Sequence, residues 1–233
     1  MRTWVMDSSS IQAYSASARV GAYDADMDLM HPNRHKMADV IVAVLAASER
    51  QPEVVVDLGT GTGFLLERIL RRFPSCRAIA MDGSGEMIAM AQSRLGSLAG
   101  RVEFRIGDFR ELGALAAVVN CADAVLSGYA LHHLNLQEKA RTLGQCRTLL
   151  KPGGWFLNAD LVIADDDFLE SLVQRMRVEG IVDRAQGGDP RFGDREETRR
   201  FLDELERKEC DQPQRLAEDL RIMQACGFRH VTL

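Results

Sequence analysis

The sequence predicts an α/β domain with a doubly wound, mostly parallel sheet, and two observations carry this prediction. First, a β-branched run at 54–56 leads through Asp57 into a turn with glycines at alternate positions, and a stretch with a helical apolar face follows over 64–73. Glycine lets such a turn bend sharply and approach a ligand closely, as nucleotide-binding folds require. Second, strand-like and helix-like segments alternate over 51–160, which indicates parallel βαβ units with right-handed crossovers.

The segment ahead of the first strand is expected to form an N-terminal helical arm over 1–50. Residues 11–20 favour a short helix, and 21–26 read as an acidic loop. Pro32 suits the first turn of a longer helix, whose apolar spacing continues to about Arg50.

The core and the segments after it follow from the same periodicity. Further strands are expected at 76–81, 102–106, 124–126, 155–160 and 228–233, and helices at 84–95, 137–150, 165–184, 194–209 and 214–226. Residues 151–154 are rich in turn formers. We therefore expect a single domain over 1–233: a core at 51–160, a helical insertion at 161–210, and a last helix and strand at 211–233.

Composition places the chain among ordinary globular proteins. Its 233 residues can bury a substantial core, and 46% hydrophobic with 27% charged residues is average usage. The formal net charge of −5 argues against non-specific nucleic-acid binding. The longest apolar run, 40–47, is too short to span a bilayer, and the N-terminus has no signal core.

The five scattered cysteines contain no CxxC pair, so we expect reduced thiols, a cytoplasmic location and no cysteine metal site. The acidic run 165–167 suits the start of a helix, and no calcium-loop spacing follows it. The sequence therefore predicts no metal site.

The spacing of the glycine turn separates two kinds of nucleotide site. A dinucleotide fingerprint that starts at Gly59 needs a third glycine at position 64, which is Phe64. The chain instead reads D-x-G-x-G-x-G from Asp57 through Gly63. This pattern resembles the first motif of the class I S-adenosylmethionine-dependent methyltransferases. Further matches follow in order over 50–160, including acids at the ends of the second and third predicted strands.

The resemblance implies S-adenosyl-L-methionine as the cofactor and a partner for each of its parts. The glycine turn would approach the methionyl group, and Asp82 would accept hydrogen bonds from the ribose hydroxyls. Asp57 either meets the cationic end or caps local N–H groups, and Met87 either packs on adenine or belongs to the core. The expected cofactor-binding residues are Asp57, Gly59, Thr60, Gly61, Gly63, Asp82, Gly83, Met87, Asp108, Phe109 and Ser127.

Methyl transfer from a sulfonium depends mainly on positioning, and a base is needed only if the acceptor must lose a proton. The catalytic candidates are His132, His133 and Tyr129, together with Asp160, all near predicted strand ends. For one of the two histidines, packing is the default interpretation.

We expect a methyltransferase with a small-molecule acceptor. The insertion at 161–210 would cover the acceptor pocket, and the N-terminal arm would close over the cofactor if it acts as a lid. Three alternatives remain: an enzyme that modifies an RNA nucleotide such as one in tRNA, a non-catalytic methyltransferase-like binding or regulatory domain, and a nicotinamide oxidoreductase, against which Phe64 counts. Nucleic acid is disfavoured as a partner because acids are interspersed among the arginines of the helices. No membrane is expected as a partner, and a homodimer is possible.

The C-terminus raises a separate expectation. The family's sheet has seven strands, whereas here no residues follow the predicted sixth strand at 228–233. We favour a shortened sequence as the explanation. The alternatives are a strand supplied by another subunit and direct pairing of strands five and six.

Overall fold

The computed structural model describes residues 11, 14, 17–112 and 120–233. Part of one expected segment lies outside these residues, namely the arm before residue 17, of which only residues 11 and 14 are described.

Five strands form one parallel sheet in the order β3-β2-β1-β4-β5. They are β1 (Val54–Leu58), β2 (Arg77–Asp82), β3 (Val102–Ile106), β4 (Ala122–Gly128) and β5 (Leu150–Ala159). β1 lies at the centre because its side chains are apolar toward both faces, and Val55, Val56 and Leu58 are fully buried. The strand order reverses between β1 and β4, and such a reversal opens a crevice at the carboxyl ends of the strands.

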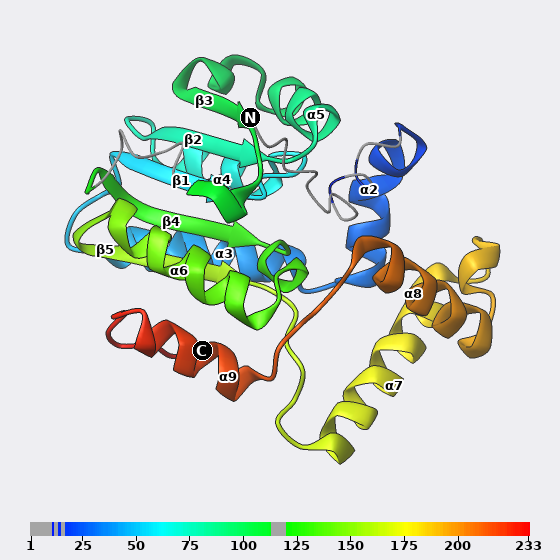
Figure 1. Ribbon diagram of the computed structural model, residues 1–233. Coiled ribbons are helices and arrows are strands. Elements are labelled where there is room, and N and C mark those ends of the chain that lie inside the picture. The colour runs from blue at the N-terminus through cyan, green and yellow to red at the C-terminus, as the bar shows by residue number, and fades with distance from the viewer. Residues whose placement is uncertain (1–10, 12–13, 15–16, 113–119) are drawn as a thin grey trace, which may run out of the picture.

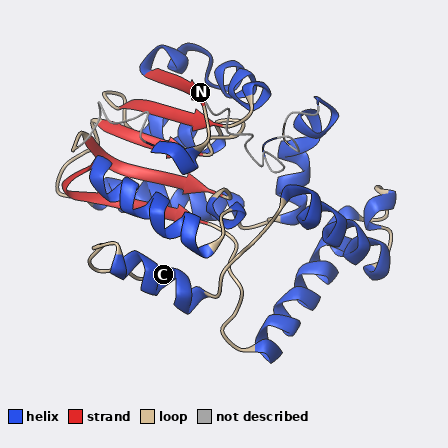
Figure 2. Ribbon diagram, in the orientation of Figure 1, coloured by secondary structure: helices blue, strands red, loops and turns tan. Residues whose placement is uncertain are grey.

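Helices cover both faces of this sheet, which confirms the doubly wound fold (Figures 1 and 2). One face packs against α3 (Arg34–Ala47), α4 (Phe64–Arg72) and α5 (Gly85–Leu95) through one apolar cluster. The other face packs against α6 (Leu136–Leu149), and α9 (Leu216–Ala225) lies against α6. Each helix buries one apolar stripe, as the 3.6-residue spacing predicts.

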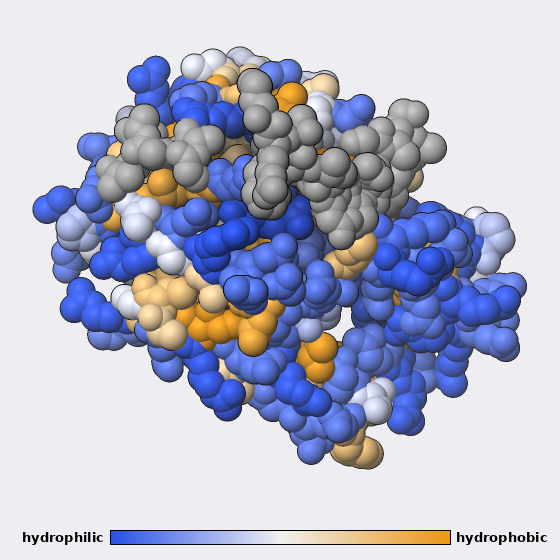
Figure 3. Space-filling model, in the orientation of Figure 1, coloured by the Kyte–Doolittle hydropathy of each residue, from blue (hydrophilic) through white to orange (hydrophobic). Residues whose placement is uncertain are grey.

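A second group of helices lies beyond the carboxyl ends of the strands (Figure 1). It comprises α2 (Ser17–Met30), α7 (Asp167–Ala185) and α8 (Arg195–Glu209). Met30, Val178, Ile181, Phe192 and Leu202 bury a small apolar core of their own. Figure 3 shows a largely hydrophilic outer surface over α8, as expected for helices that turn their apolar stripes inward. We call α7 and α8 the cap.

Three local predictions differ from the structure. The acidic loop expected at 21–26 is part of α2, because Asp24 and Asp26 find cationic partners elsewhere in the fold. The turn expected at 151–154 lies inside β5, as an irregularity in its pairing with β4. Both predictions used local composition, which tertiary contacts override.

The strand expected at 228–233 does not form. Gly227 ends α9 with φ +87°, and Phe228 then turns its ring onto Phe156 of β5, with 5.3 Å between ring centroids. His230 has φ +57°, a left-handed conformation that interrupts an extended strand. The described residues therefore contain a sheet that ends at β5.

Candidate functional site

Three adjoining cavities lie at the carboxyl edge of the sheet. The β2 cleft, of about 620 Å³, is lined mainly by residues that follow β1, β2 and β3. The β1 cleft, of about 510 Å³, lies between the glycine turn, α2, α3 and the end of β4. The cap chamber, of about 380 Å³, lies between α2, the cap and the segment after β4.

The glycine turn separates the first two cavities, and its backbone requires glycine at one position above all. Gly59 has φ +68°, and a Cβ there would lie 2.4 Å from the Cβ of Ala130. The amides of Gly59 and Thr60 donate to the carbonyl of Met81 at 2.9 and 3.0 Å, which fixes the turn on β2. The turn therefore presents bare backbone to both clefts.

Asp57 ends β1 and is almost fully buried under this turn. The hydroxyl of Thr60 donates to its Oδ2 at 2.7 Å. Burial raises the pKa of Asp57 to about 6, and the charge of Asp82 adds to this shift although the Thr60 hydrogen bond opposes it. The carboxyl group lines the β1 cleft.

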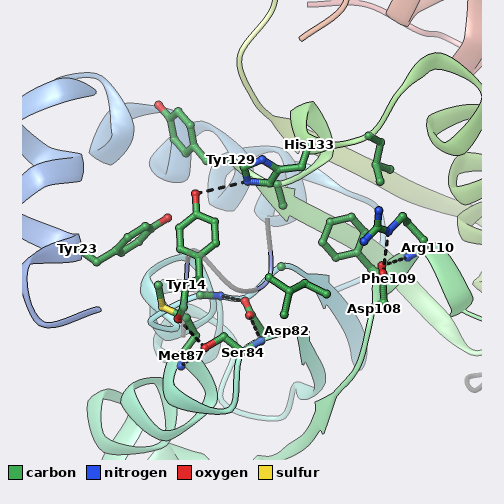
Figure 4. Close-up of a pocket in the computed structure, with 16 residues that line it drawn as sticks. Tyr14, Tyr23, Asp82, Ser84, Met87, Asp108, Phe109, Arg110, Tyr129 and His133 are labelled. Atoms are coloured by element: carbon green, nitrogen blue, oxygen red, sulfur yellow. Dashed lines mark hydrogen bonds and ion pairs between the residues drawn. The ribbon is translucent and has the colours of Figure 1, made fainter. Parts of the chain in front are cut away.

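Asp82 ends β2 and holds two loops at once. Its Oδ2 accepts from the amide of Gly61 at 2.8 Å, and its Oδ1 accepts from the amide of Ser84 at 2.9 Å (Figure 4). Burial raises the pKa of Asp82, and these backbone N–H groups oppose the rise. Each carboxylate oxygen keeps a further lone pair, so Asp82 can still accept hydrogen bonds from a ligand.

The far end of the β2 cleft combines an acid with apolar surfaces. Asp108 accepts from the amide of Arg110 at 2.8 Å and from its Nε at 2.7 Å. The ring of Phe109 and the side chain of Met87 both line the cleft (Figure 4). This is a slot for a flat, partly apolar ring with one polar edge.

Most residues expected to bind the cofactor thus line the two clefts, but Gly63 and Ser127 line neither of those described. Gly63 has φ +76° at the start of α4, and a Cβ there would lie 3.2 Å from Ala91 of α5. Its lack of a side chain therefore serves helix packing. Ser127 is fully buried within β4, between Leu58 and Asn158.

Arg34 was missed by sequence reasoning, although it lines the β1 cleft. Its side chain is buried, and Nη2 pairs with Asp24 Oδ1 at 2.7 Å. Asp24 also accepts from Thr62 at 2.9 Å and pairs with Arg94, so α2 is tied to the glycine turn. An arginine at the start of an amphipathic helix gives no sequence signal of such burial.

The side chains of the cap chamber include several ionisable groups. Burial and the charge of Arg177 lower the pKa of His31 to about 3. Tyr129 has φ +54°, and its hydroxyl donates to Met37 Sδ at 3.3 Å. Burial, with the nearby Asp160, raises the pKa of Tyr129 to about 12. Tyr129 lines all three cavities and so marks their junction.

The two candidate histidines lie at the same junction, with ring centroids 4.1 Å apart. His132 Nδ1 contacts Asp160 Oδ1 at 2.5 Å, and its Nε2 lies 3.5 Å from Asp211 Oδ1. Burial alone would lower the pKa of His132, but the two carboxylates outweigh it and raise the value to about 10. His133 faces the β2 cleft, where its Nε2 lies 3.5 Å from the hydroxyl of Tyr14 (Figure 4).

Asp211 was also missed, because it lies 78 residues after His133 in the sequence and carries no motif. Its Oδ1 lies 3.0 Å from His133 Nδ1. Burial would raise the pKa of Asp211, but the two histidines lower it well below its usual range.

Comparison with known proteins agrees with the fold and shows what the chain is similar to. Residues 55–154 match the family model described as a methyltransferase domain. This segment of the chain therefore resembles a methyltransferase domain. Its five-stranded parallel sheet agrees with this assignment, and the resemblance drawn from the glycine turn is confirmed.

The methyltransferase domain has relatives of known and unknown role. An uncharacterised methyltransferase of Anoxybacillus flavithermus is 30% identical over 138 residues, which are 59% of this chain and 61% of that relative. A malonyl-[acyl-carrier protein] O-methyltransferase of Halalkalibacterium halodurans is 26% identical over 82% of this chain and 69% of its own length. An O-methyltransferase family structure from Burkholderia thailandensis superposes with a TM-score of 0.66 at 19% identity, over 93% of this chain and 56% of that one.

The chain thus spans less than two thirds of the first of these relatives. Within the described residues, none of the helices has the length and apolar character needed to cross a membrane.

Proposed function

We propose that the chain is an S-adenosylmethionine-dependent methyltransferase that methylates a small-molecule acceptor by in-line displacement. One observation carries the proposal. The two clefts share Gly59, Gly61, Tyr23 and Tyr129, so they adjoin on either side of the glycine turn at the strand-order reversal, and Tyr129 also lines the cap chamber. We call the two adjoining clefts together the trough. A cofactor in the trough would present its reactive centre to an acceptor in the chamber.

The residues of the trough fit the parts of this cofactor. Spare lone pairs of Asp82 suit the ribose diol, and the slot at Phe109 and Met87 suits adenine, with Asp108 at its polar edge. The methionyl carboxylate and ammonium would lie in the β1 cleft, between Arg34 and Asp57. When bound, the cofactor supplies a methyl group already activated by its sulfonium.

The chain's own part in the reaction is to position the acceptor and exclude water. Held by Asp82, Arg34 and Asp57, the cofactor would supply the methyl carbon to a lone pair of the acceptor and would keep the electron pair of its own broken bond. A protonated acceptor loses its proton to solvent or to a chamber carboxylate. Tyr129 stands between trough and chamber, and its hydroxyl keeps its proton because burial raises its pKa to about 12.

The acceptor is proposed to be small because α2 and the cap border the chamber, whose space of about 380 Å³ includes its open mouth. A polynucleotide needs an extended basic surface. Two arginines of the helices are paired with acids instead: Arg71 binds Glu67 at 2.7 Å, and Arg199 binds Asp203 at 2.6 Å. O-methylation is named for two of the relatives, and we propose an oxygen acceptor for this chain as well.

Calorimetry with S-adenosylhomocysteine and with NAD tests the cofactor. We expect the first to bind and the second not to bind. Mass spectrometry of small molecules that copurify with the protein then tests the acceptor. Binding of NAD alone would overturn the class, and cofactor binding without turnover of any copurifying acceptor would favour a regulatory domain.

A further inference from the structure

The junction of the three cavities holds a cluster of potential metal ligands, of which the proposed reaction uses at most the carboxylate of Asp211. His132, His133 and Asp211 each direct one ligand atom into a common region, and these atoms lie within 4.8 Å of one another. We propose that this cluster binds one divalent transition-metal ion, with zinc as the best chemical fit. Two imidazoles and one carboxylate leave at least one coordination position open, as in catalytic zinc sites.

The spacing of the ligand atoms supports the proposal. Two ligands on one tetrahedral zinc ion lie roughly 3.3 Å apart, because each bond is about 2.0–2.1 Å long. Asp211 Oδ1 lies 3.0 Å from His133 Nδ1 and 3.5 Å from His132 Nε2. These two separations bracket the expected value, and all three ligand atoms lie within 4.8 Å of one another, so an ion can bind all three once the side chains move closer together.

The hydrogen bonding of the cluster is incomplete without a cation. His133 Nδ1 and Asp211 Oδ1 are both buried, and neither has a hydrogen-bond partner in the described part of the chain. They lie 3.0 Å apart, within ion-pair distance, but the contact does not have the geometry of a hydrogen bond. A proton on His132 Nε2 would give Asp211 Oδ1 a hydrogen-bond donor, but His133 Nδ1 would still have no partner. A metal ion engages all three atoms.

The groups that contact the histidines from behind also have the form that a metal site requires. His132 Nδ1 contacts Asp160 at 2.5 Å, and the His132 amide donates to the other oxygen of the same carboxylate at 3.0 Å. A carboxylate behind a histidine fixes its tautomer and leaves Nε2 free to coordinate. On the other side, the Gln212 amide donates to the carbonyl of His132 at 2.7 Å, which holds Asp211 against the histidine pair.

The sequence predicted no metal site because spacing along the chain was the criterion, whereas these ligands come from two segments that only the fold brings together. The position also deepens the proposed function, on which this step rests. His133 lines the β2 cleft, and His132 and Asp211 line the cap chamber. An ion between them can bind an acceptor hydroxyl at its open position and lower the pKa of that hydroxyl, as zinc does for water.

Cobalt titration of the chelator-treated full-length protein tests the site without any activity assay. We expect one Co²⁺ per chain, with d–d absorption typical of four or five ligands, and displacement by Zn²⁺. Asp211→Asn and His133→Asn should each weaken binding by about 100-fold or more, and Asp160→Asn by roughly 10- to 100-fold. The matched controls His230→Asn and Asp183→Asn alter exposed residues and should bind as the wild type does.

Wild-type binding no tighter than that of Asp211→Asn would overturn the proposal, and so would equal losses in the controls. Circular dichroism tests whether each variant is folded. If a variant is not folded, His133→Gln is measured in its place. Calorimetry with S-adenosylhomocysteine runs in parallel. Failure of the wild type to bind that ligand rejects the proposed function, whereas the cobalt result tests the metal site by itself.

Discussion

Replacing Asp82 by alanine tests the centre of the proposed cofactor site. The carboxylate spans the trough, with one oxygen on the amide of Gly61 and the other on the amide of Ser84, at 2.8 and 2.9 Å. Alanine removes these two acceptors together with the lone pairs proposed for the ribose. A lost charge-assisted hydrogen bond costs about 1.5–3 kcal/mol, so the Kd for S-adenosylhomocysteine should rise roughly 10- to 150-fold.

Asp123→Ala is a matched control at the opposite edge of the sheet. Asp123 Oδ2 also accepts from two backbone amides, those of Glu53 and Val54, each at 2.9 Å. Both substitutions therefore remove a carboxylate that satisfies two N–H groups, and both should lower the thermal midpoint. Only Asp82→Ala should change cofactor affinity. Isothermal titration calorimetry measures the affinity, and a folded Asp82→Ala variant with wild-type affinity would refute the ribose assignment.

Three further predictions concern stability. Gly59→Ala should destabilise the fold by more than the ~1–2 kcal/mol that a left-handed alanine costs, because its Cβ would lie 2.4 Å from the Cβ of Ala130. Gly61→Ala should destabilise the fold less, because its Cβ would have no atom within 4 Å. Equal urea midpoints for the two variants would contradict this. Burial raises the pKa of Asp57 to about 6, so the native state binds more protons than the unfolded state between about pH 4 and 6. The contribution of Asp57 to the free energy of unfolding therefore falls by about 3 kcal/mol as pH rises through that range. Asp57→Asn should remove this fall, and urea unfolding of the variant and the wild type at several pH values measures it. Lys139→Ala should lower the free energy of unfolding by about 3–5 kcal/mol, because it leaves Asp219 buried without its 2.8 Å partner. The double variant Lys139→Met, Asp219→Leu should regain most of that free energy in the same urea assay. No gain would show that the loss comes from packing.

Sequence analysis predicted the fold because the decisive signals are local. The alternation of apolar periods, the glycines after β1 and the acids that end β1 and β2 each lie within one short segment, and a parallel sheet brings all strand ends to one edge. The positions of Asp57, Gly59, Asp82 and Asp108 around the clefts follow from this topology. The cap helices were equally predictable from their apolar spacing.

Tertiary structure alone decided the features that depend on partners distant in the sequence. Residues 21–26 read as a loop by composition, yet they are helical because Asp24 pairs with Arg34 and Arg94. Residues 228–233 form no strand, because His230 adopts a left-handed conformation and the ring of Phe228 packs against the ring of Phe156.

Asp211 meets the histidine pair only because the chain after α8 returns to the end of β4. Periodicity and motif spacing describe the chain within about a dozen residues, whereas buried ion pairs and ligand clusters join segments that no local pattern relates. The sequence therefore determined the sheet and the edge at which the site lies. The fold decided which charges meet there.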